Sequence, residues 1–361
     1  MHRATITAAA TALLVLAAAT AEALPRYSAT YGQRCALCHV EPTGGGLRTT
    51  YASMALVPEE LSFLQMDAEE TARIRPDLSP AVTVGLDIRN LVVEGEDDDA
   101  RERSGQYAMQ ADVHVGLQMD DRMAAYVRTG RGGVREYAGL AYVLPAGGYL
   151  KAGRFTPDFG WRWADHRTAT RMYLLDAGGS RTPDALVDTG MEAGFHGQWW
   201  EATGSLLQGG AGNGDSYAAR VAVRRSLGPV NVALGSSIIR RQHADGHVRA
   251  WGGFGYLAAG PAAWVFEVDE TGDGAREGIV MSQELTWRLT RGISARGTYS
   301  FHDPDRHETT GARTRWGVGL DTLLNPFFGA QLMANRYDTD AGDLVAADDY
   351  WQGELVLHFL Y

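Results

Sequence analysis

From residue 81 to the C-terminus, hydrophobic and polar residues alternate along short segments of the chain. Residues 82–89, with the sequence VTVGLDIR, place an apolar side chain at every second position. Successive side chains of a β-strand point to opposite faces, so this period of two indicates strands with one apolar face. The sequence therefore predicts an all-β fold with about 16 strands. We expect them near residues 82–94, 105–119, 122–130, 134–145, 147–155, 188–198, 199–209, 216–227, 230–242, 246–259, 261–270, 278–290, 292–302, 312–323, 326–338 and 349–361.

The connections between these strands alternate in length. Two-residue turns such as Asp120-Asp121 and Gly228-Pro229 alternate with longer segments such as residues 156–187 and 303–311. An even number of strands, short turns at one end and long loops at the other are typical of a transmembrane antiparallel β-barrel of the outer membrane. The longest loop includes the sequence GRFTPDFG at residues 153–160, followed by Asp165, His166 and Arg171. It is similar to the constriction-loop region of phosphate-type porins.

The face opposite the apolar one is charged, as expected for a water-filled lumen. A soluble sandwich whose charged face contacts water is the alternative. The predicted inward residues are Asp87, Arg89, Asp112, His114, Glu192, His196, Arg220, Arg224, Glu267, Glu284, Arg288, Arg296, Asp321, Glu354 and His358.

Aromatic residues near the strand ends favour the barrel, because such residues form girdles at the two membrane interfaces. The last strand also carries an outward apolar face that ends at the terminal Tyr361. The predicted girdle residues are Trp199, Trp200, Trp251, Trp264, Trp287, Trp316, Phe327 and Trp351.

The first 23 residues are typical of a secretory signal peptide. An early arginine precedes an apolar run at residues 8–19 and then small residues, and Pro25 follows. A transmembrane anchor is the alternative, but the run is short for a membrane span. The sequence therefore predicts an exported protein of two parts: a small segment at residues 24–80 and a barrel at residues 81–361.

The small segment contains CALCH at residues 35–39, which has the C-x-x-C-H pattern of covalent haem attachment. The two thiols, Cys35 and Cys38, can bond the two vinyl groups of one haem, and His39 can ligate the iron. A disulfide, a redox C-x-x-C and a zinc site are the alternatives. No βαβ pattern surrounds the motif, and no second cysteine pair exists, so we expect one covalently bound haem c.

The segment is too short to form a hydrophobic core by itself. We therefore expect the haem and the barrel to complete that core, with the segment either in the periplasm or inside the lumen as a plug. A helix is expected at residues 58–64 and a linker at residues 75–80. The glycines of residues 44–46 let the backbone approach a flat ligand or form a flexible turn. Three nearby arginines could pair with the haem propionates or remain solvated: Arg26, Arg34 and Arg48.

The sixth ligand of the iron could be a methionine, a histidine or nothing. Within the segment, Met54 is the first candidate, because it lies in an apolar stretch, and Met66 is the second. Both have core packing as the alternative role. Inward barrel histidines are further candidates: His114, His196 and His358.

The net charge of −11, without a basic stripe, argues against binding to nucleic acid. The net charge does not indicate which molecules the protein binds on either side of the membrane.

The whole pattern resembles the porin–cytochrome fusions of iron-oxidising bacteria, in which a monohaem segment precedes a barrel. The specific likeness lies around residues 25–48, chiefly Cys35, Cys38, His39 and Pro42. The resemblance implies the outer membrane of a Gram-negative bacterium, electron transfer across that membrane and possible oxidation of Fe(II). The implied partners are a periplasmic cytochrome or other electron carrier, an extracellular electron donor or acceptor, and outer-membrane lipid.

An electron-transfer protein is therefore expected rather than a conventional enzyme. A solute channel with a structural or sensory haem is the alternative function. A peroxidase-like enzyme with an open sixth iron position is a further one.

Overall fold

The computed structural model describes residues 25–97, 102–130, 133–163, 165, 167–175, 186–210, 215–243, 246–341 and 348–361. The predicted signal peptide and His166 lie outside this set. Sixteen long strands follow a short helical segment. The strands are β2 Val82–Asp97, β3 Glu102–Gln118, β4 Met123–Gly130, β5 Gly133–Leu144, β6 Gly148–Phe155, β7 Asp188–His196, β8 Trp200–Leu207, β9 Ser216–Leu227, β10 Val230–His243, β11 Gly246–Ala259, β12 Ala262–Gly272, β13 Glu277–Thr290, β14 Ile293–Asp303, β15 Arg313–Asn325, β16 Phe328–Thr339 and β17 Tyr350–Leu360.

These strands form one closed antiparallel barrel. Each strand pairs with its neighbour in sequence, and β17 pairs with β2 to close the ring, with Phe359 opposite Ile88. The predicted sixteen-stranded barrel is therefore confirmed. A further short strand, β1 (Asp77–Ser79), pairs only with the start of β2 and lies within the segment expected as a linker.

The barrel is apolar outside and polar inside. Of the fifteen residues predicted to face inward, all except His196 and Arg288 are buried. Of the eight predicted girdle residues, all except Phe327 are exposed. Along β17, outward Trp351 and Phe359 alternate with buried Glu354 and His358. This polarity is the reverse of a soluble core and agrees with a wall that contacts lipid.

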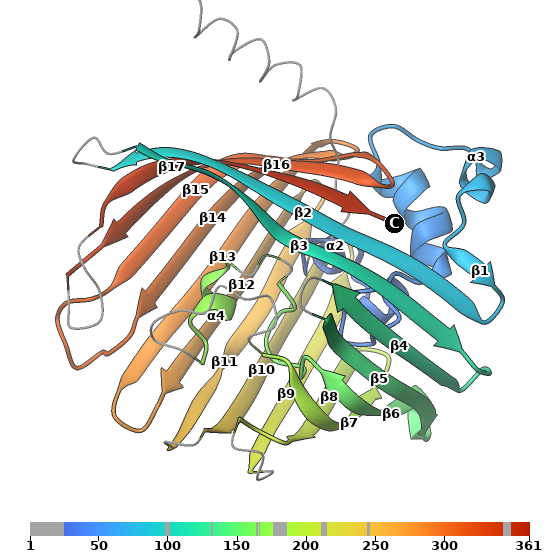
Figure 1. Ribbon diagram of the computed structural model, residues 1–361, viewed down its shortest axis with the longest axis horizontal. Helices are drawn as coiled ribbons and strands as arrows, with labels where there is room; N and C mark the ends of the chain where they lie inside the picture. Colours follow the sequence, from blue (N-terminus) through green and yellow to red (C-terminus); the bar gives the residue numbers. More distant parts are fainter. Residues whose placement is uncertain are drawn as a thin grey trace, which may run out of the picture.

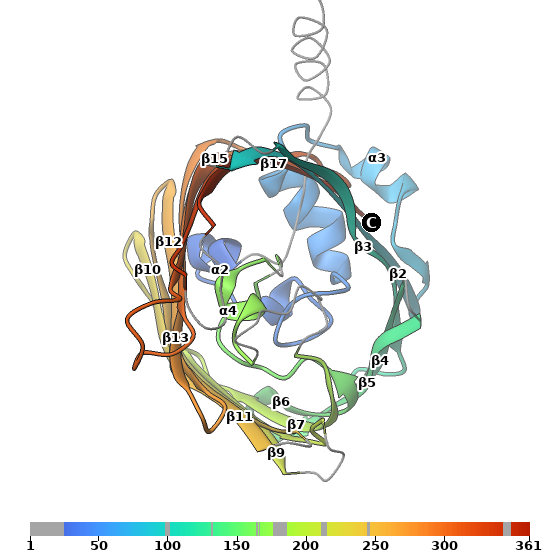
Figure 2. The same cartoon turned by 60° about the vertical axis from the view of Figure 1, so that its left-hand side comes forward.

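The helical elements lie at one end of the barrel or inside it. They are α2 Pro25–Tyr31, η1 Cys35–Leu37, η2 Ala52–Leu61, α3 Ala68–Arg73, η3 Pro145–Gly147 and α4 Ala169–Met172. Looking along the barrel, Figure 2 shows α2 and α4 within the ring of strands and α3 beside its rim. None of the helices in the described ranges is long and apolar enough to cross a membrane.

The N-terminal segment closes the short-turn end of the barrel, near the C-terminus of the chain (Figure 1). Arg26 of α2 pairs with two carboxylates of the wall, Glu284 at 3.2 Å and Asp321 at 2.8 Å. Asn231, near a short turn, donates hydrogen bonds to the carbonyls of Ala29 and Thr30. The segment is thus held by buried polar contacts as well as by packing.

The helix expected at residues 58–64 is displaced toward the N-terminus. It spans Ala52–Leu61, and the chain then leaves the helix at Ser62. The amides of Phe63 and Leu64 donate instead to the carbonyls of Leu323 and Leu324, at 2.7 and 2.6 Å. These bonds to the end of β15 replace further helical turns and fix the segment to the rim.

Candidate functional site

The CALCH motif forms a single tight turn inside the mouth of the barrel. The amides of Cys38 and His39 both donate to the carbonyl of Cys35, each at 3.0 Å, so η1 brings the two cysteines together. The chain then reverses, and the Val40 amide donates to the Leu47 carbonyl at 3.0 Å. Neither cysteine is joined to the other in a disulfide.

The glycines of residues 44–46 form the tip of this reversal. All three have positive φ angles, between 64° and 100°, which residues with a Cβ rarely adopt. A Cβ on Gly44 would lie 3.0 Å from the Cys35 Cβ and 3.1 Å from its sulfur. The triplet is therefore a left-handed turn that also passes close to the first cysteine.

A cavity of about 410 Å³ lies beside the motif, within the range of cofactor pockets. We call it the motif pocket. Cys35, Cys38 and His39 line it together, as the sequence predicted for a shared ligand. The rest of its wall is mainly aromatic and aliphatic, with three arginines. These further residues include Tyr27, Tyr31, Arg34, Arg48, Tyr51, Leu56, Val57, Leu61, Trp161 and Arg162.

The electrostatics of the motif suit a haem. Burial lowers the pKa of His39 to about 3, and Arg48 and Arg162 add to the shift, so the imidazole is in the neutral form that ligates a metal. The Gly45 and Gly46 backbone offsets a small part of this shift in pKa, and the Nδ1 atom of His39 has no hydrogen-bond partner among the described residues. Burial also raises the pKa of the Cys35 thiol to about 11. An apolar pocket, two thiols and a neutral imidazole are what covalent haem attachment requires, and the residues fit that group.

The other residues predicted to contact the haem do not all line the motif pocket. Arg34 and Arg48 line the motif pocket, whereas Arg26 is occupied by Glu284 and Asp321 and anchors the segment instead. Met54 lies on η2, whose neighbouring Leu56 and Val57 line the pocket, but neither Met54 nor Met66 does. Their ligation stays a prediction.

The candidate barrel histidines also lie outside the motif pocket. His358 is fully buried and contacts Asp87 at 2.7 Å. His114 lies beside Gly46, and its Nε2 atom has no hydrogen-bond partner among the described residues. His196 lines a small neighbouring cavity together with Arg34 and Cys35. Of the three, His196 is the one that shares a cavity with a cysteine of the motif.

The described part of the longest loop lies inside the ring of strands (Figure 2), and its residues Trp161 and Arg162 line the motif pocket. Sequence reasoning did not assign Trp161 and Arg162 to the haem site, although both line the motif pocket. Trp161 is fixed by its ring N–H, which donates to the Gly255 carbonyl at 3.1 Å, and by stacking on Tyr256. The repeated tryptophans of GWRW at residues 160–163 were the available signal.

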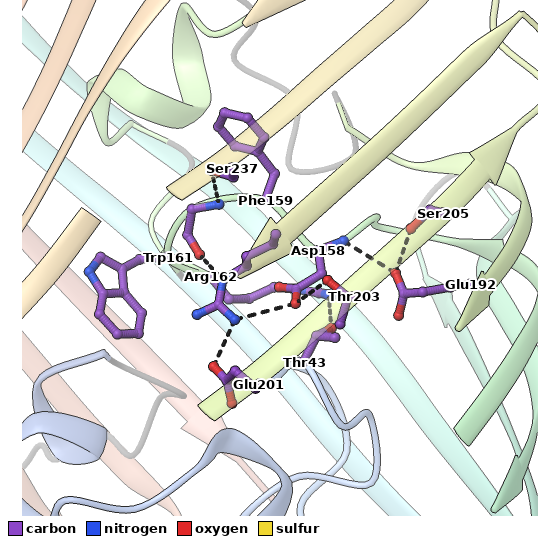
Figure 3. Close-up of polar contacts among 12 residues, drawn as sticks. Thr43, Asp158, Phe159, Trp161, Arg162, Glu192, Glu201, Thr203, Ser205 and Ser237 are labelled. Carbon is purple, nitrogen blue, oxygen red and sulfur yellow. Dashed lines mark hydrogen bonds and ion pairs between the residues drawn. The ribbon is translucent and has the colours of Figure 1, made fainter. Parts of the chain in front are cut away.

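A polar network holds this inner loop to the wall (Figure 3). The Asp158 amide contacts Glu192 at 3.4 Å, and its carboxylate accepts a hydrogen bond from Thr203 at 3.0 Å. Arg220 donates to the Gly160 carbonyl at 3.0 Å. Burial raises the pKa of Asp158 to about 6, and Glu192 adds to the shift.

A second network joins the motif to the wall through Lys151, the only lysine in the sequence. Its ammonium lies 2.9 Å from Glu41 of the N-terminal segment and 2.7 Å from Glu192 of β7. Tyr126 also donates to Glu41, at 2.5 Å. Burial alone would raise the pKa of Glu41, but Lys151, Arg162 and this hydrogen bond hold it below its usual range. Glu41, two residues after His39, thus attaches the N-terminal segment to the barrel wall.

No protein-family model and no curated protein matches this sequence. Solved outer-membrane barrels are similar in fold. The structure of OmpT from Vibrio cholerae is 12% identical, covers 80% of this chain and 100% of its own, and gives a TM-score of 0.58. The anion-selective porin from Comamonas acidovorans is 9% identical, covers 78% and 99%, and also scores 0.58. OprB from Pseudomonas putida is 9% identical, covers 78% and 94%, and scores 0.60.

At these identities the likeness shows the fold alone. The chain has the barrel fold of porins and other outer-membrane proteins, with an added N-terminal segment.

Proposed function

We propose that this protein is an outer-membrane barrel of the porin type that holds one covalently attached haem in its lumen and transfers electrons across the membrane. The observation that carries the proposal is the motif pocket: Cys35, Cys38 and His39 line one cavity inside the barrel mouth. The outer membrane is proposed from the closed barrel, its apolar exterior and its aromatic girdles.

Each residue of the pocket has a role in this proposal. The two cysteines would hold the haem covalently, and His39 would ligate its iron through an imidazole nitrogen. Arg34, Arg48 and Arg162 supply positive charge for the propionates. A bound haem c would provide reversible one-electron transfer. The chain itself would hold and orient the group, and Trp161 of the inner loop lines the pocket beside it.

The two ends of the lumen would serve different partners. Short turns face the periplasm in outer-membrane barrels, so the motif pocket lies toward a periplasmic electron carrier such as a cytochrome. The long loops would face an extracellular electron donor or acceptor, with iron as one candidate. The role is that of an electron-transfer protein, with Fe(II) oxidation as a possible reaction at the outer end.

A solute channel is the second candidate, and the likeness to porins favours it. In that case the haem would be structural or sensory. Electron transfer stays the first candidate because the C-x-x-C-H motif lines a cavity within the ring of strands, where the N-terminal segment also lies (Figure 2).

Liposomes that contain the full-length protein separate the two functions. We expect reduction of ferricyanide enclosed in the vesicles by an external reductant that does not cross the membrane, and no swelling in small sugars. The double variant Cys35→Ala, Cys38→Ala should lose covalent haem and electron transfer. Ala36→Ser, between the cysteines, is the matched control and should keep both.

Sugar uptake without electron transfer by the haem-loaded protein would support the channel and exclude the proposed function. A haem-stained band that persists in the double variant on a denaturing gel would refute covalent attachment through these cysteines.

A further inference from the structure

A second cavity lies at the long-loop end of the lumen, with a volume of about 580 Å³. We call it the vestibule. Its wall is formed by β2, β3, β14, β15, β16 and β17 and by the inner loop around α4. The vestibule and the motif pocket share no lining residue. The barrel therefore contains two separate sites, one toward each end.

Two arginines of the vestibule form no salt bridge among the residues that the structure describes, although Glu354 and Asp165 attract Arg315 electrostatically. Arg313 and Arg315 both line the cavity and form no ion pair in the described ranges, and the Nε atom of Arg315 is buried without a hydrogen-bond partner there. Arg167, which also lines the cavity, is by contrast paired with Asp165 at 2.7 Å and with Glu354 at 2.6 Å. The vestibule thus presents two guanidinium groups that remain available to an anion.

Aromatic rings lie beside these two arginines. The Arg313 guanidinium lies 5.0 Å from the centre of the Tyr173 ring, and Arg315 lies 5.9 Å from that of Tyr337. Tyr173 also stacks on His302, with the ring centres 4.1 Å apart and the planes 4° from parallel. His302 is only 1% exposed, and its Nδ1 atom has no hydrogen-bond partner among the described residues.

We propose that the vestibule binds a small aromatic carboxylate. The planar guanidinium forks of Arg313 and Arg315 match the two oxygens of a carboxylate. The apolar side chains of Leu91 and Met109 suit an aromatic ring beside the stacked pairs Tyr173–His302 and Tyr337–Tyr350, and the cavity volume lies in the range for small-molecule sites. A buried imidazole nitrogen without a partner, at His302, offers one further hydrogen bond to the ligand.

This site does not depend on the haem, so it is tested separately. Equilibrium dialysis with detergent-solubilised, full-length protein would measure binding of benzoate, with cyclohexanecarboxylate and benzyl alcohol as comparison probes. We expect benzoate to bind at least tenfold more tightly than either, because cyclohexanecarboxylate lacks an aromatic ring and benzyl alcohol lacks the negative charge.

The double variant Arg313→Gln, Arg315→Gln should bind benzoate at least tenfold more weakly. Arg315→Lys keeps the positive charge but loses the planar guanidinium, so its loss of benzoate affinity should be smaller. This variant replaces the double variant if the latter does not assemble. Arg249→Gln is the matched control, because Arg249 is exposed, pairs with Glu277 and does not line the vestibule. Its affinity should equal that of the wild type.

Retention of wild-type affinity by the correctly assembled double variant would overturn the proposal. The same holds if benzoate does not bind at millimolar concentration, or if cyclohexanecarboxylate binds as tightly.

Discussion

Replacing Glu41 with alanine should loosen the N-terminal segment from the barrel wall. Glu41 is 4% exposed and accepts contacts from Lys151 at 2.9 Å and from Tyr126 at 2.5 Å, both from strands of the barrel. The change would leave the buried Tyr126 hydroxyl without this acceptor. It would also leave Lys151 with Glu192 alone as its carboxylate partner.

The size of the effect follows from these contacts. A hydrogen bond to a charged group contributes about 1.5–3 kcal/mol, and a buried donor left without a partner adds to the loss. Since about 1.4 kcal/mol corresponds to a factor of ten, opening of the segment should become roughly ten- to a hundredfold more frequent. Glu41→Gln keeps the shape and one acceptor oxygen, so its effect should be smaller.

Lys151 gives a direct measurement of this opening. It is the only lysine in the sequence and is 1% exposed, so an amine-reactive ester can label its side chain only when the contact opens. Mass spectrometry of the peptide that contains Lys151 would separate this label from that on the N-terminal amine. Glu60→Ala, an exposed change in the same segment, is the control and should label as slowly as the wild type.

Two results would refute this reasoning. One is labelling of Lys151 in the wild-type barrel as fast as in the denatured protein. The other is slow labelling in Glu41→Ala that equals the wild-type rate. Either result would mean that the segment is not held at Lys151.

The remaining predictions concern the iron ligand, the inner loop and assembly. Met54→Ala should change the absorption spectrum of the haem and lower its reduction potential, because Met54 shares η2 with residues of the motif pocket. Met66→Ala should change neither property. Unchanged spectra in both variants would exclude methionine ligation. Because burial raises the pKa of Asp158 to about 6, the folded protein should lose stability as pH rises from about 4 to 6. Asp158→Asn should flatten this part of the stability curve in denaturant titrations, and an unchanged slope would contradict the assignment. Deleting Tyr361 should reduce the outer-membrane fraction that migrates as a compact band on unboiled gels, and an unchanged fraction would contradict a role of this residue in assembly.

The strands could be predicted closely because the two faces of the wall meet different surroundings. In β17, for example, the alternation of Trp351 with Glu354 and His358 already separates lipid from lumen. Strand bounds differ from the predicted ones by a few residues at most, since turns such as Gly260-Pro261 interrupt the pattern sharply. The C-x-x-C-H motif could also be recognised from the sequence, because it consists of five consecutive residues.

The contacts between the segment and the wall could not be predicted, since they join residues far apart in the sequence. Glu41 and Lys151 are separated by 110 positions, and Arg26 and Glu284 by 258. Arg26 was a candidate partner of the haem propionates because it lies near the motif in the sequence. In the structure its guanidinium pairs with carboxylates of the barrel wall instead. Trp161 was missed for the same reason, as only the fold brings the inner loop against the motif pocket.

The inner loop is the element that separates the two cavities and contacts both. Trp161 and Arg162 line the motif pocket, and Tyr173 lines the vestibule. Arg171 fixes the loop by donating to the Phe159 carbonyl at 3.0 Å and by facing Glu267 of the wall at 3.4 Å. Buried ion pairs hold both this loop and the N-terminal segment to the barrel wall. Because the two cavities share no lining residue, substitutions in one of them can test that site while leaving the lining of the other unchanged.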